Sequence, residues 1–436
     1  MELVLPYLFL PFFGFLVIGV PVAFSLGLAS TYFIFFSGTR IPPLILMTQM
    51  YGGIDSFALL ALPMFVLTGE LLNRLNLTQR LINVARALVG WIKGGLAHVN
   101  IVTSMFFAGI SGSVLADAAS IGPIMIPAMI RERYPAAFSA AVTGSSAVIG
   151  AIIPPSIPLI IVGGSMQISI SGLFAAGIIP GLLVGLFLMI TAFLYSFFRG
   201  YGEIHRFEGV VPVAREAFGA LPVLVIPFLI LYGILGGVMT PTEAGAIAAL
   251  YSIILGFIYG TLNGTFSLLE FFNALLGTAK VTGSSLIIVG MAIVFGQILI
   301  FHQFPQDLLE LVLSLTENRV LLFLIIVLFF LFVGTFMDAV ANMIILGPLL
   351  MPIALEGLGM HPIQYGVFLM VGLLLGVITP PLGIVLFIVA PIAKTSIENT
   401  AIAVIPFLIA ELIVLTLIAF VPAVTLYLPR LAGIVG

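Results

Sequence analysis

The sequence has no cysteine and very few charged residues. Without cysteine it can form no disulfide framework and no thiolate metal site, so cysteine content says nothing about the redox compartment. Only 7% of the 436 residues are charged and 62% are apolar, whereas a typical soluble domain has about 25% charged residues. The net charge of −3 is too small to indicate a nucleic-acid partner. We therefore expect a protein that lies in the lipid bilayer, with no soluble domain.

Motifs for catalysis are also missing. The sequence has no HExxH motif and no Walker loop. The histidines are scattered along the chain, at His98, His205, His302 and His361. An intramembrane protease needs a nucleophile with a base, an aspartate pair or a metal cluster, and no such pattern is present. We expect no enzymatic activity, no ATP hydrolysis by this chain and no organic cofactor.

What the sequence does contain is an internal repeat. The segment from Phe107 through Gly122-Pro123 to Pro127 recurs 225 positions later, without a gap, as residues 332–352. The segment 150–155 recurs at an offset of 226 as residues 376–381. Glycine and double-proline interruptions at matching places in two apolar halves indicate a secondary transporter, whose substrate and ions bind at broken helices near the bilayer midplane.

Apolar runs of about 20 residues predict the membrane spans. They lie near residues 4–19, 21–36, 54–72, 135–166, 170–198, 219–236, 243–261, 283–301, 362–393 and 399–427, with helical hairpins near 95–131 and 320–357. The first apolar stretch has no basic leader and no small-residue cleavage site. We therefore expect it to be retained as two spans rather than removed as a signal peptide.

The basic residues predict the orientation. If both ends of the first hairpin face the cytoplasm, 11 basic residues lie inside and 3 outside, which obeys the positive-inside rule. The inside group is Arg74, Arg80, Arg86, Lys93, Arg131, Arg133, Arg199, Arg206, Arg215, Lys280 and Lys394, and the outside group is Arg40, Arg319 and Arg430. Both termini then face the periplasm of a bacterial inner membrane. The second hairpin opens to the opposite side from the first, so the halves form an inverted repeat.

A segment before each hairpin does not resemble a span. Apolar residues recur at helical spacing at Leu77, Leu81, Ala85, Leu88 and Ile92, with Arg80 and Arg86 between them. Residues 307–315 show the same pattern beside acidic residues. Both segments are typical of amphipathic helices along a membrane interface. We interpret them as arms that link a fixed frame to a moving part; the alternative is that they are interfacial loops.

The double prolines predict two breaks in the helical backbone. A proline inside a helix cannot donate to the carbonyl four residues earlier. Pro154–Pro155 and Pro380–Pro381 therefore release the carbonyls of Gly150, Ala151, Gly376 and Val377. An unpaired carbonyl is costly in hydrocarbon, and a bound cation would satisfy it. Thr379 adds a hydroxyl in the second break, where Ile153 occupies the first. The alternative is a pair of kinks satisfied by neighbouring helices.

The hairpin tips carry small and polar residues. Gly109-Ile-Ser111-Gly112-Ser113 forms the first tip, and Gly334-Thr335-Phe-Met-Asp338 forms the second. A short helix begins beyond each tip, and its N-terminal end suits an anionic substrate. The alternative is that these residues only let helices pack closely.

Few carboxylates lie in the apolar segments. Asp117 and Asp338 are nearest to the tips, and burying a charge at this depth is costly. Each is a candidate ion or proton ligand, or else a helix cap. Asn342 aligns with Asp117 in the repeat, and its side-chain amide is an uncharged candidate for the same role. For Glu70, Glu243 and Glu411 we favour packing or subunit contacts, because none aligns with a broken segment.

These motifs resemble one family. Residues 106–117, 150–155, 240–244 and 376–383 are similar to the large membrane subunit of tripartite ATP-independent periplasmic (TRAP) transporters, and the similarity covers essentially the whole chain. The resemblance implies an all-α polytopic elevator carrier in which sodium entry drives uptake. We divide the chain into scaffold parts at 1–94 and 199–318, each with one arm helix, and transport parts at 95–198 and 319–436, each with one hairpin and one broken helix.

The resemblance also implies sites and partners. At least two sodium sites are expected, at Ser111, Gly112, Ser113, Gly150, Ile153 and Pro155 in the first half and at Gly334, Gly376, Thr379 and Leu382 in the second. Candidate substrate contacts are Ser111, Gly112, Ser113, Pro154, Thr335, Asp338 and Pro380. The expected partners are a small membrane (Q) subunit, on a separate polypeptide, and a periplasmic binding protein (P subunit) that delivers a carboxylate or sugar acid. The alternatives are a proton-coupled or stand-alone anion symporter, or a channel.

Overall fold

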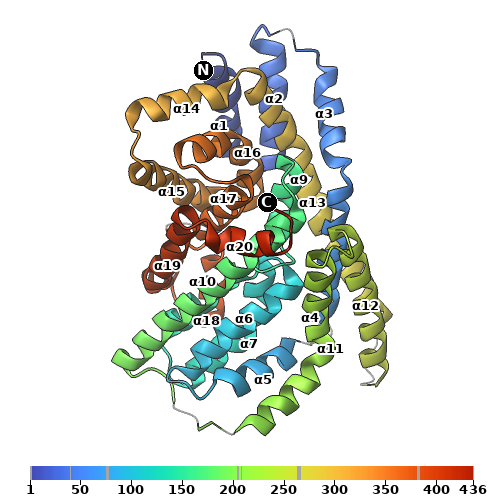
Figure 1. Cartoon of the computed structure of the whole chain (residues 1–436), viewed down its shortest axis with the longest axis vertical. Coiled ribbons are helices and arrows are strands. Elements are labelled where there is room, and N and C mark those ends of the chain that lie inside the picture. Colours follow the sequence, from blue (N-terminus) through green and yellow to red (C-terminus); the bar gives the residue numbers. More distant parts are fainter. Residues whose placement is uncertain are drawn as a thin grey trace.

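The computed structural model describes residues 2–39, 41–74, 78–203, 206–207, 209–262, 267–380 and 383–435. Among the residues discussed above, Arg40, Leu77, His205, Pro381 and Leu382 fall outside these ranges. The described residues form helices and no strand (Figure 1). Nine of these helical segments are long and apolar enough to cross a membrane. The prediction of an all-α polytopic membrane protein is confirmed at this level.

The N-terminal region contains one helix that the sequence did not predict. The predicted spans 4–19 and 21–36 correspond to η1 (Leu5–Phe9) with α1 (Leu10–Val17) and to α2 (Val22–Phe36). The predicted span 54–72 is η2 (Phe57–Leu60) with α4 (Ala61–Arg74). The additional helix, α3 (Leu44–Ile54), packs against α13 (Leu268–Phe301). A Cβ at Gly290 of α13 would lie 2.7 Å from Ile54 and 2.9 Å from Met50, so glycine permits this close packing.

Both amphipathic segments are helical. The first is α5 (Thr78–Val89), which buries Leu81, Ile82 and Ala85 against α6 (Gly95–Ser111) and α11 (Val210–Leu235). The second is α14 (Phe304–Leu315), which packs against α13 and α16 (Ala339–Pro352). Each lies directly before a hairpin in the chain, as the apolar spacing predicted.

Arg80 fastens α5 to two long helices. Its Nη1 donates to the Gly219 carbonyl of α11 at 2.7 Å and to the Tyr259 hydroxyl of α12 (Pro241–Leu262) at 3.1 Å. The guanidinium also lies over the Tyr259 ring, 4.4 Å from its centroid. The same helix packs against α6 on its other side. The Arg80 guanidinium therefore joins α5 to both α11 and α12.

We expect Arg80→Ala to lower the thermal stability of the purified protein, because hydrogen bonds to a charged group contribute about 1.5–3 kcal/mol. Arg80→Lys keeps the charge but loses the planar stacking. Its melting temperature should therefore lie between those of the original protein and of Arg80→Ala. Gln79→Ala is the control, since Gln79 is exposed on the same helix and bonds only locally to Asn83. Equal melting temperatures for Arg80→Ala and Gln79→Ala would show that the contact contributes nothing.

The two predicted hairpins and the two predicted breaks are present. The hairpins are α6 with α7 (Val114–Arg131), and α15 (Arg319–Phe336) with α16. The broken helices are α8 (Ala136–Ile149) followed by α9 (Ile157–Met166), and α17 (Pro362–Gly376) followed by α18 (Leu386–Ala393). In Figure 1, α5, α6 and α7 lie in the lower half of the view, whereas α14, α15 and α16 lie in the upper half. Each half of the sequence thus gives the same order of elements.

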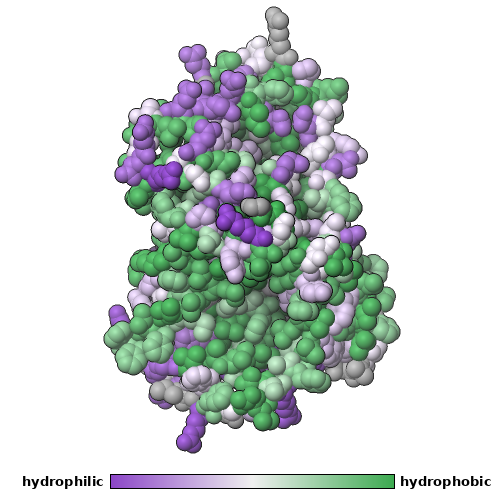
Figure 2. All heavy atoms as spheres, in the orientation of Figure 1, coloured by the Kyte–Doolittle hydropathy of each residue, from purple (hydrophilic) through white to green (hydrophobic). Residues whose placement is uncertain are grey.

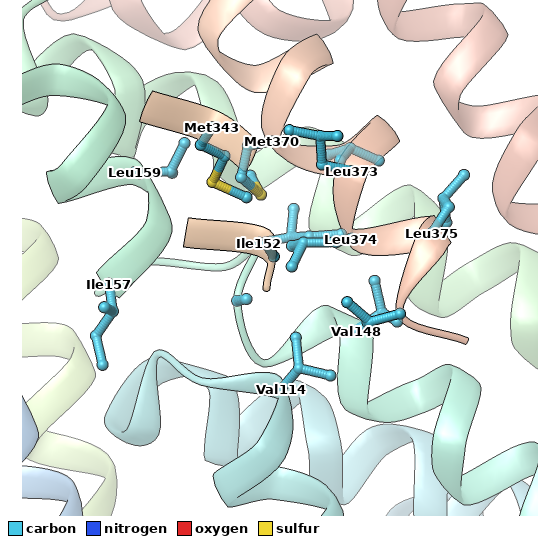
Figure 3. Packing of buried hydrophobic residues seen from close by; sticks show 14 of the residues in the cluster. Val114, Val148, Ile152, Ile157, Leu159, Met343, Met370, Leu373, Leu374 and Leu375 are labelled. Atoms are coloured by element: carbon cyan, nitrogen blue, oxygen red, sulfur yellow. The ribbon is translucent and has the colours of Figure 1, made fainter. Parts of the chain in front are cut away.

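The halves interlock through their broken helices. The second part of each broken helix packs on the other half's hairpin: α9 contacts α16, and α18 contacts α7. In addition, α18 contacts α8 of the first broken helix. Buried apolar side chains fill the junction, and Figure 3 shows Val148 and Ile152 of the first break in one cluster with Leu373, Leu374 and Leu375 of α17. This dry core fixes the position of each break relative to both hairpins.

The remaining long helices differ from the predicted spans mainly in length. The predicted span 170–198 is α10 (Ile170–Arg199), and α12 matches 243–261. By contrast, α11 and α13 begin well before the predicted residues 219 and 283. The predicted span 399–427 is divided into α19 (Ile397–Phe420) and α20 (Ala423–Leu431) around Pro422. The face shown in Figure 2 is largely apolar, with polar residues gathered over its upper half and at its lower end.

Candidate functional site

The tip of the first hairpin lies against the first break. The Gly112 carbonyl accepts a hydrogen bond from the Ile157 amide at 3.2 Å. A Cβ at Gly112 would lie 2.6 Å from the Pro155 carbonyl oxygen, and Gly112 has a φ of +62°. Only glycine combines this left-handed conformation with so close an approach. The structure therefore brings Gly112, Pro154 and Pro155 together.

Asp117 lies at the centre of this first junction. Its side chain is fully buried, and its Oδ1 accepts a hydrogen bond from the Ser111 hydroxyl. Its Oδ2 has no hydrogen-bond partner among the described residues. A Cβ at Gly150 would overlap this carboxylate, so the glycine leaves room for it. An orphaned buried carboxylate oxygen next to a broken helix is the kind of ligand that a hard cation takes.

The released carbonyls of the first break have one donor that the sequence analysis missed. The Ser156 hydroxyl donates to the Ala151 carbonyl. The same oxygen accepts from the Leu159 amide at 3.2 Å and so caps α9. Serine directly before an apolar helical run is a recognisable N-cap signal. Because a carbonyl has two lone pairs, the bond from Ser156 leaves the Ala151 oxygen able to accept a second ligand.

The second junction is made by backbone against backbone. A Cβ at Gly334, in the second tip, would lie 2.8 Å from the Gly376 Cα, and a Cβ at Gly376 would lie 2.5 Å from the Gly334 Cα. The Thr379 hydroxyl donates to the Leu375 carbonyl at 2.6 Å. Its lone pairs stay available to a cation, as the sequence analysis required of this residue.

The carbonyls released in the second break also find donors. The Thr379 amide bonds the Gly376 carbonyl, and the Val385 amide bonds the Val377 carbonyl, both at 3.1 Å. The break is therefore a compact loop rather than a row of bare oxygens. The second proline, Pro381, and the predicted ligand Leu382 lie outside the described residues.

Ser113 and Asp338 cap the helices beyond the two tips. Ser113 Oγ accepts from the Ala116 amide at 3.4 Å, and Asp338 Oδ1 accepts from the Val340 and Ala341 amides at 2.9 and 3.4 Å. Asn342 instead donates to the Val333 and Met337 carbonyls, both at 3.4 Å. Of the two roles open to the acidic residues, capping applies to Asp338, whereas Asp117 accepts from a side chain.

Thr335 completes the second tip. Its hydroxyl donates to the Phe332 carbonyl at 2.7 Å, and the side chain is buried. The Thr335 hydroxyl therefore uses its hydrogen within the last turn of α15 and has none left to donate to a ligand. Its oxygen still has lone pairs, so any contact with a substrate would have to use Thr335 as an acceptor.

A small cavity opens beside the first tip. Its volume is about 70 Å³, and Ser111, Ser113 and Ala116 line it from the hairpin. Glu70 and Asn73 line it from α4, on the far side. Hydroxyl, amide and carboxylate groups therefore face one space between α4 and the first hairpin.

The three carboxylates for which packing was favoured have different surroundings. Glu70 forms an ion pair with Arg74 at 3.4 Å, and Arg74 also bonds Glu270 at 2.8 Å. Glu243 accepts from the Thr240 amide at 2.8 Å at the start of α12. Glu411 of α19 is fully buried, and neither carboxylate oxygen has a partner in the described part of the chain. Within that part no three acidic, histidine or cysteine side chains cluster as a transition-metal site would require.

Comparison with known proteins identifies one family. Residues 9–424 match the sequence profile of the tripartite ATP-independent periplasmic transporter, DctM component. The chain is 39% identical over 424 residues to the sialic acid TRAP transporter large permease SiaM of Vibrio cholerae, covering 96% of each chain. It is 35% identical over 413 residues to the C4-dicarboxylate TRAP transporter large permease DctM of Pseudomonas aeruginosa, covering 94% of each.

A third relative is longer than this chain. The isethionate TRAP transporter permease DctMQ of Oleidesulfovibrio alaskensis is 38% identical over 426 residues, which are 97% of this chain and 66% of the relative. Among solved structures, the YdaH transporter of Alcanivorax borkumensis superposes with a TM-score of 0.62 at 19% identity, covering 95% of this chain and 98% of the other. That likeness concerns the fold alone.

Proposed function

The chain belongs to the DctM family of tripartite ATP-independent periplasmic transporters, and we propose that it is the permease through which sodium entry drives the uptake of an organic anion. The observation that carries the proposal is the pair of junctions between a hairpin tip and a broken helix. In secondary transporters, unwound backbone carbonyls coordinate the coupling ion, and half-helix N-termini point at the anionic substrate.

The first junction supplies a donor set that suits sodium. This junction brings together Ser111, Asp117 and the Gly150 backbone. The buried Oδ2 of Asp117 has no hydrogen-bond partner among the described residues, so it is available to a cation. In the second junction, the Gly376 backbone lies against the Gly334 backbone, and Thr379 of the same break carries a hydroxyl. Hard cations take hydroxyl, carbonyl and carboxylate oxygens. Two such sets support at least two sodium sites, one in each half.

The relatives support an anionic substrate. Their names specify sialic acid, C4-dicarboxylate and isethionate, all of which are organic anions. In this chain, the N-terminal ends of α7 and α16 follow the two tips, and Ser111 and Ser113 line the cavity beside the first. The Ser113 and Asp338 side chains already cap these N-termini, so the helix dipole and the remaining amides are what favour an anion. We infer that the substrate binds between the first tip and α4.

We propose an elevator motion for the transport step. The scaffold comprises the helices from α1 to α4 and from α11 to α13, and the transport domain comprises both hairpins and both broken helices. The arms α5 and α14 connect the two, and the contact of Arg80 with α11 and α12 supports this role for α5. The repeat, read with the positive-inside rule, gives an inverted arrangement in which both termini face the periplasm.

Partners follow from the family. We propose a small membrane (Q) subunit and a periplasmic binding protein (P subunit) that delivers the anion. One relative carries its Q part in the same polypeptide, as its printed name DctMQ indicates. The bacterial inner membrane is the corresponding location.

The proposed function is tested by uptake into liposomes that contain this chain and its Q subunit, with the binding protein and a radiolabelled acid outside. An inward sodium gradient should drive accumulation, and replacing sodium by potassium should abolish it. The buried carboxylates Asp117 and Glu411 favour proton coupling as the second candidate. Accumulation driven by a pH gradient without sodium would establish that alternative, and uptake without accumulation would indicate a channel.

Removing single hydroxyls should weaken the response to sodium. We expect Thr379→Ala and Ser113→Ala to raise the sodium concentration for half-maximal uptake severalfold, because each loses one oxygen ligand. Thr191→Ala is the matched control for Thr379, since Thr191 of α10 makes the same bond to the carbonyl four residues earlier, at 2.9 Å. Ser396→Ala is the control for Ser113, because Ser396 caps α19. Unchanged sodium activation in both test variants would count against the proposed sites.

A further inference from the structure

A second, larger cavity lies at the end of the molecule near α5. Its volume is about 360 Å³, and it is bounded by α5, by the turn that follows α5, by the end of the first hairpin and by the start of α11. Its lining includes the charged residues Arg86, Arg206 and Glu216 and the aromatic residues Trp91 and Phe207. None of them belongs to the tip–break junctions.

Three of the charged side chains in this lining are available to a ligand. Arg86, Arg206 and Glu216 make no side-chain hydrogen bond or ion pair with any residue that the structure describes. A guanidinium presents a planar fork of donors that matches the oxygens of a phosphate group. Two such forks on the rim of one cavity suit a phosphate, and the carboxylate of Glu216 suits an ammonium group.

The aromatic groups place the cavity at a membrane boundary. Trp91 and Phe207 meet edge to face, with ring centroids 5.6 Å apart. Tryptophan is typical of the membrane–water interface. Beside them Val210 and Val211 are 73% and 80% exposed, which suits contact with acyl chains and not with water. Polar groups thus face the cavity while apolar groups continue away from it.

We propose that this cavity binds the headgroup of a zwitterionic phospholipid, with the phosphate on Arg86 and Arg206 and a primary ammonium on Glu216. Basic pockets on the cytoplasmic side of membrane proteins take anionic lipids. Here Glu132 and Glu216 balance the two arginines in the lining, which favours a headgroup of no net charge. The ligand is therefore an ethanolamine phospholipid, and its headgroup joins α5, the first hairpin and α11.

This lipid site is separate from the tip–break junctions and does not depend on the transported anion. Trp91 is the single tryptophan of the chain, so its fluorescence reports on this cavity. The full chain in detergent is titrated with phosphatidylethanolamine, phosphatidylcholine and phosphatidylglycerol of equal chain length. We expect a saturable change in Trp91 emission with phosphatidylethanolamine at a lower mole fraction than with the other two. An equal response to all three lipids would overturn the proposal.

Variants identify the contacts. Arg86→Gln with Arg206→Gln should weaken the phosphatidylethanolamine response about tenfold or more, because charged hydrogen bonds are lost. Glu216→Gln should remove the preference for phosphatidylethanolamine over phosphatidylglycerol, a result that does not depend on the folding of the double variant. Arg215→Gln is the control, since Arg215 is an exposed neighbour outside the lining. An unchanged response in the double variant and in Glu216→Gln would contradict the assignment.

Two soluble probes distinguish the lipid from its phosphate. Phosphoethanolamine and inorganic phosphate carry the same group without acyl chains. We expect neither to change Trp91 emission at the concentrations at which the lipid saturates. A response to either probe equal to that of the lipid would overturn the lipid assignment.

Discussion

Replacing Gly376 by alanine is expected to reduce sodium-driven uptake by at least about tenfold. The new Cβ would lie 2.5 Å from the Gly334 Cα and 2.8 Å from the Gly334 carbonyl carbon. Both neighbours are backbone, so no side chain can move aside, and the second tip must separate from the second break. Overpacking costs about 1–3 kcal/mol, and about 1.4 kcal/mol corresponds to a factor of ten. Initial uptake rates in liposomes, normalised to the amount of inserted protein, measure the effect.

The matched control is Gly144→Ala in α8. A Cβ there would meet only Val385 and Val389 side chains at 3.5 Å, which is ordinary contact. This variant should retain uptake close to that of the original protein. If Gly376→Ala and Gly144→Ala transported equally well, close contact between tip and break would be unnecessary, and the second ion site would have to lie elsewhere.

Asp117→Asn is expected to raise the sodium concentration for half-maximal uptake by about tenfold or more. The substitution keeps the size of the side chain and an acceptor for the Ser111 hydroxyl, but it removes the charge and replaces one carboxylate oxygen by an amide. Interactions with a charged partner contribute about 1.5–3 kcal/mol, and about 1.4 kcal/mol is tenfold in affinity. The sodium dependence of uptake at saturating substrate measures the change.

Glu411→Gln is the control for this substitution. Glu411 is also fully buried, and its change from carboxylate to amide is the same, but it lies on α19, outside both hairpins and both breaks. Its sodium dependence should stay as in the original protein. A shift in Glu411→Gln with none in Asp117→Asn would move the proposed ion site from the first junction to the last long helix.

The sequence predicts the unusual elements of this fold better than the ordinary ones. Paired prolines cannot continue a helix, and the first tip carries Gly112 in a left-handed conformation. The repetition of these signals 225 or 226 positions later distinguishes them from isolated kinks. Both hairpins, both breaks and both amphipathic helices therefore follow from the sequence.

Helix ends depend on tertiary packing, which the sequence does not display. Thr48, Gln49 and two glycines weaken the apolar pattern of α3, yet Gly290 lets it pack closely on α13. The start of α13 carries Glu270 and Lys280, which the apolar pattern excluded from a span. In the structure Glu270 pairs with Arg74 of α4, a partner distant in the chain that the sequence does not show.

The sequence predicts which residues lie at the tips and breaks, but not which hydrogen bonds they make. The sequence places Ser111, Gly150 and Thr379 at the tips and breaks, and the structure has them there. It gave no means of knowing that Ser156 bonds the Ala151 carbonyl, or that Asp338 caps α16 while Asp117 accepts from Ser111. Such choices between local and distant partners depend on three-dimensional distances that proline and glycine spacing leaves open.

The central claim, that the tip–break junctions bind sodium, is tested most directly by the thermal stability of the purified chain in sodium and in choline chloride at equal ionic strength. A ligand that binds only the folded state raises its stability with the logarithm of the ligand concentration once that concentration exceeds the dissociation constant. The account predicts a melting temperature that keeps rising with sodium in this way, with a smaller rise in Asp117→Asn and in Thr379→Ala. Identical melting curves in sodium and choline would contradict it.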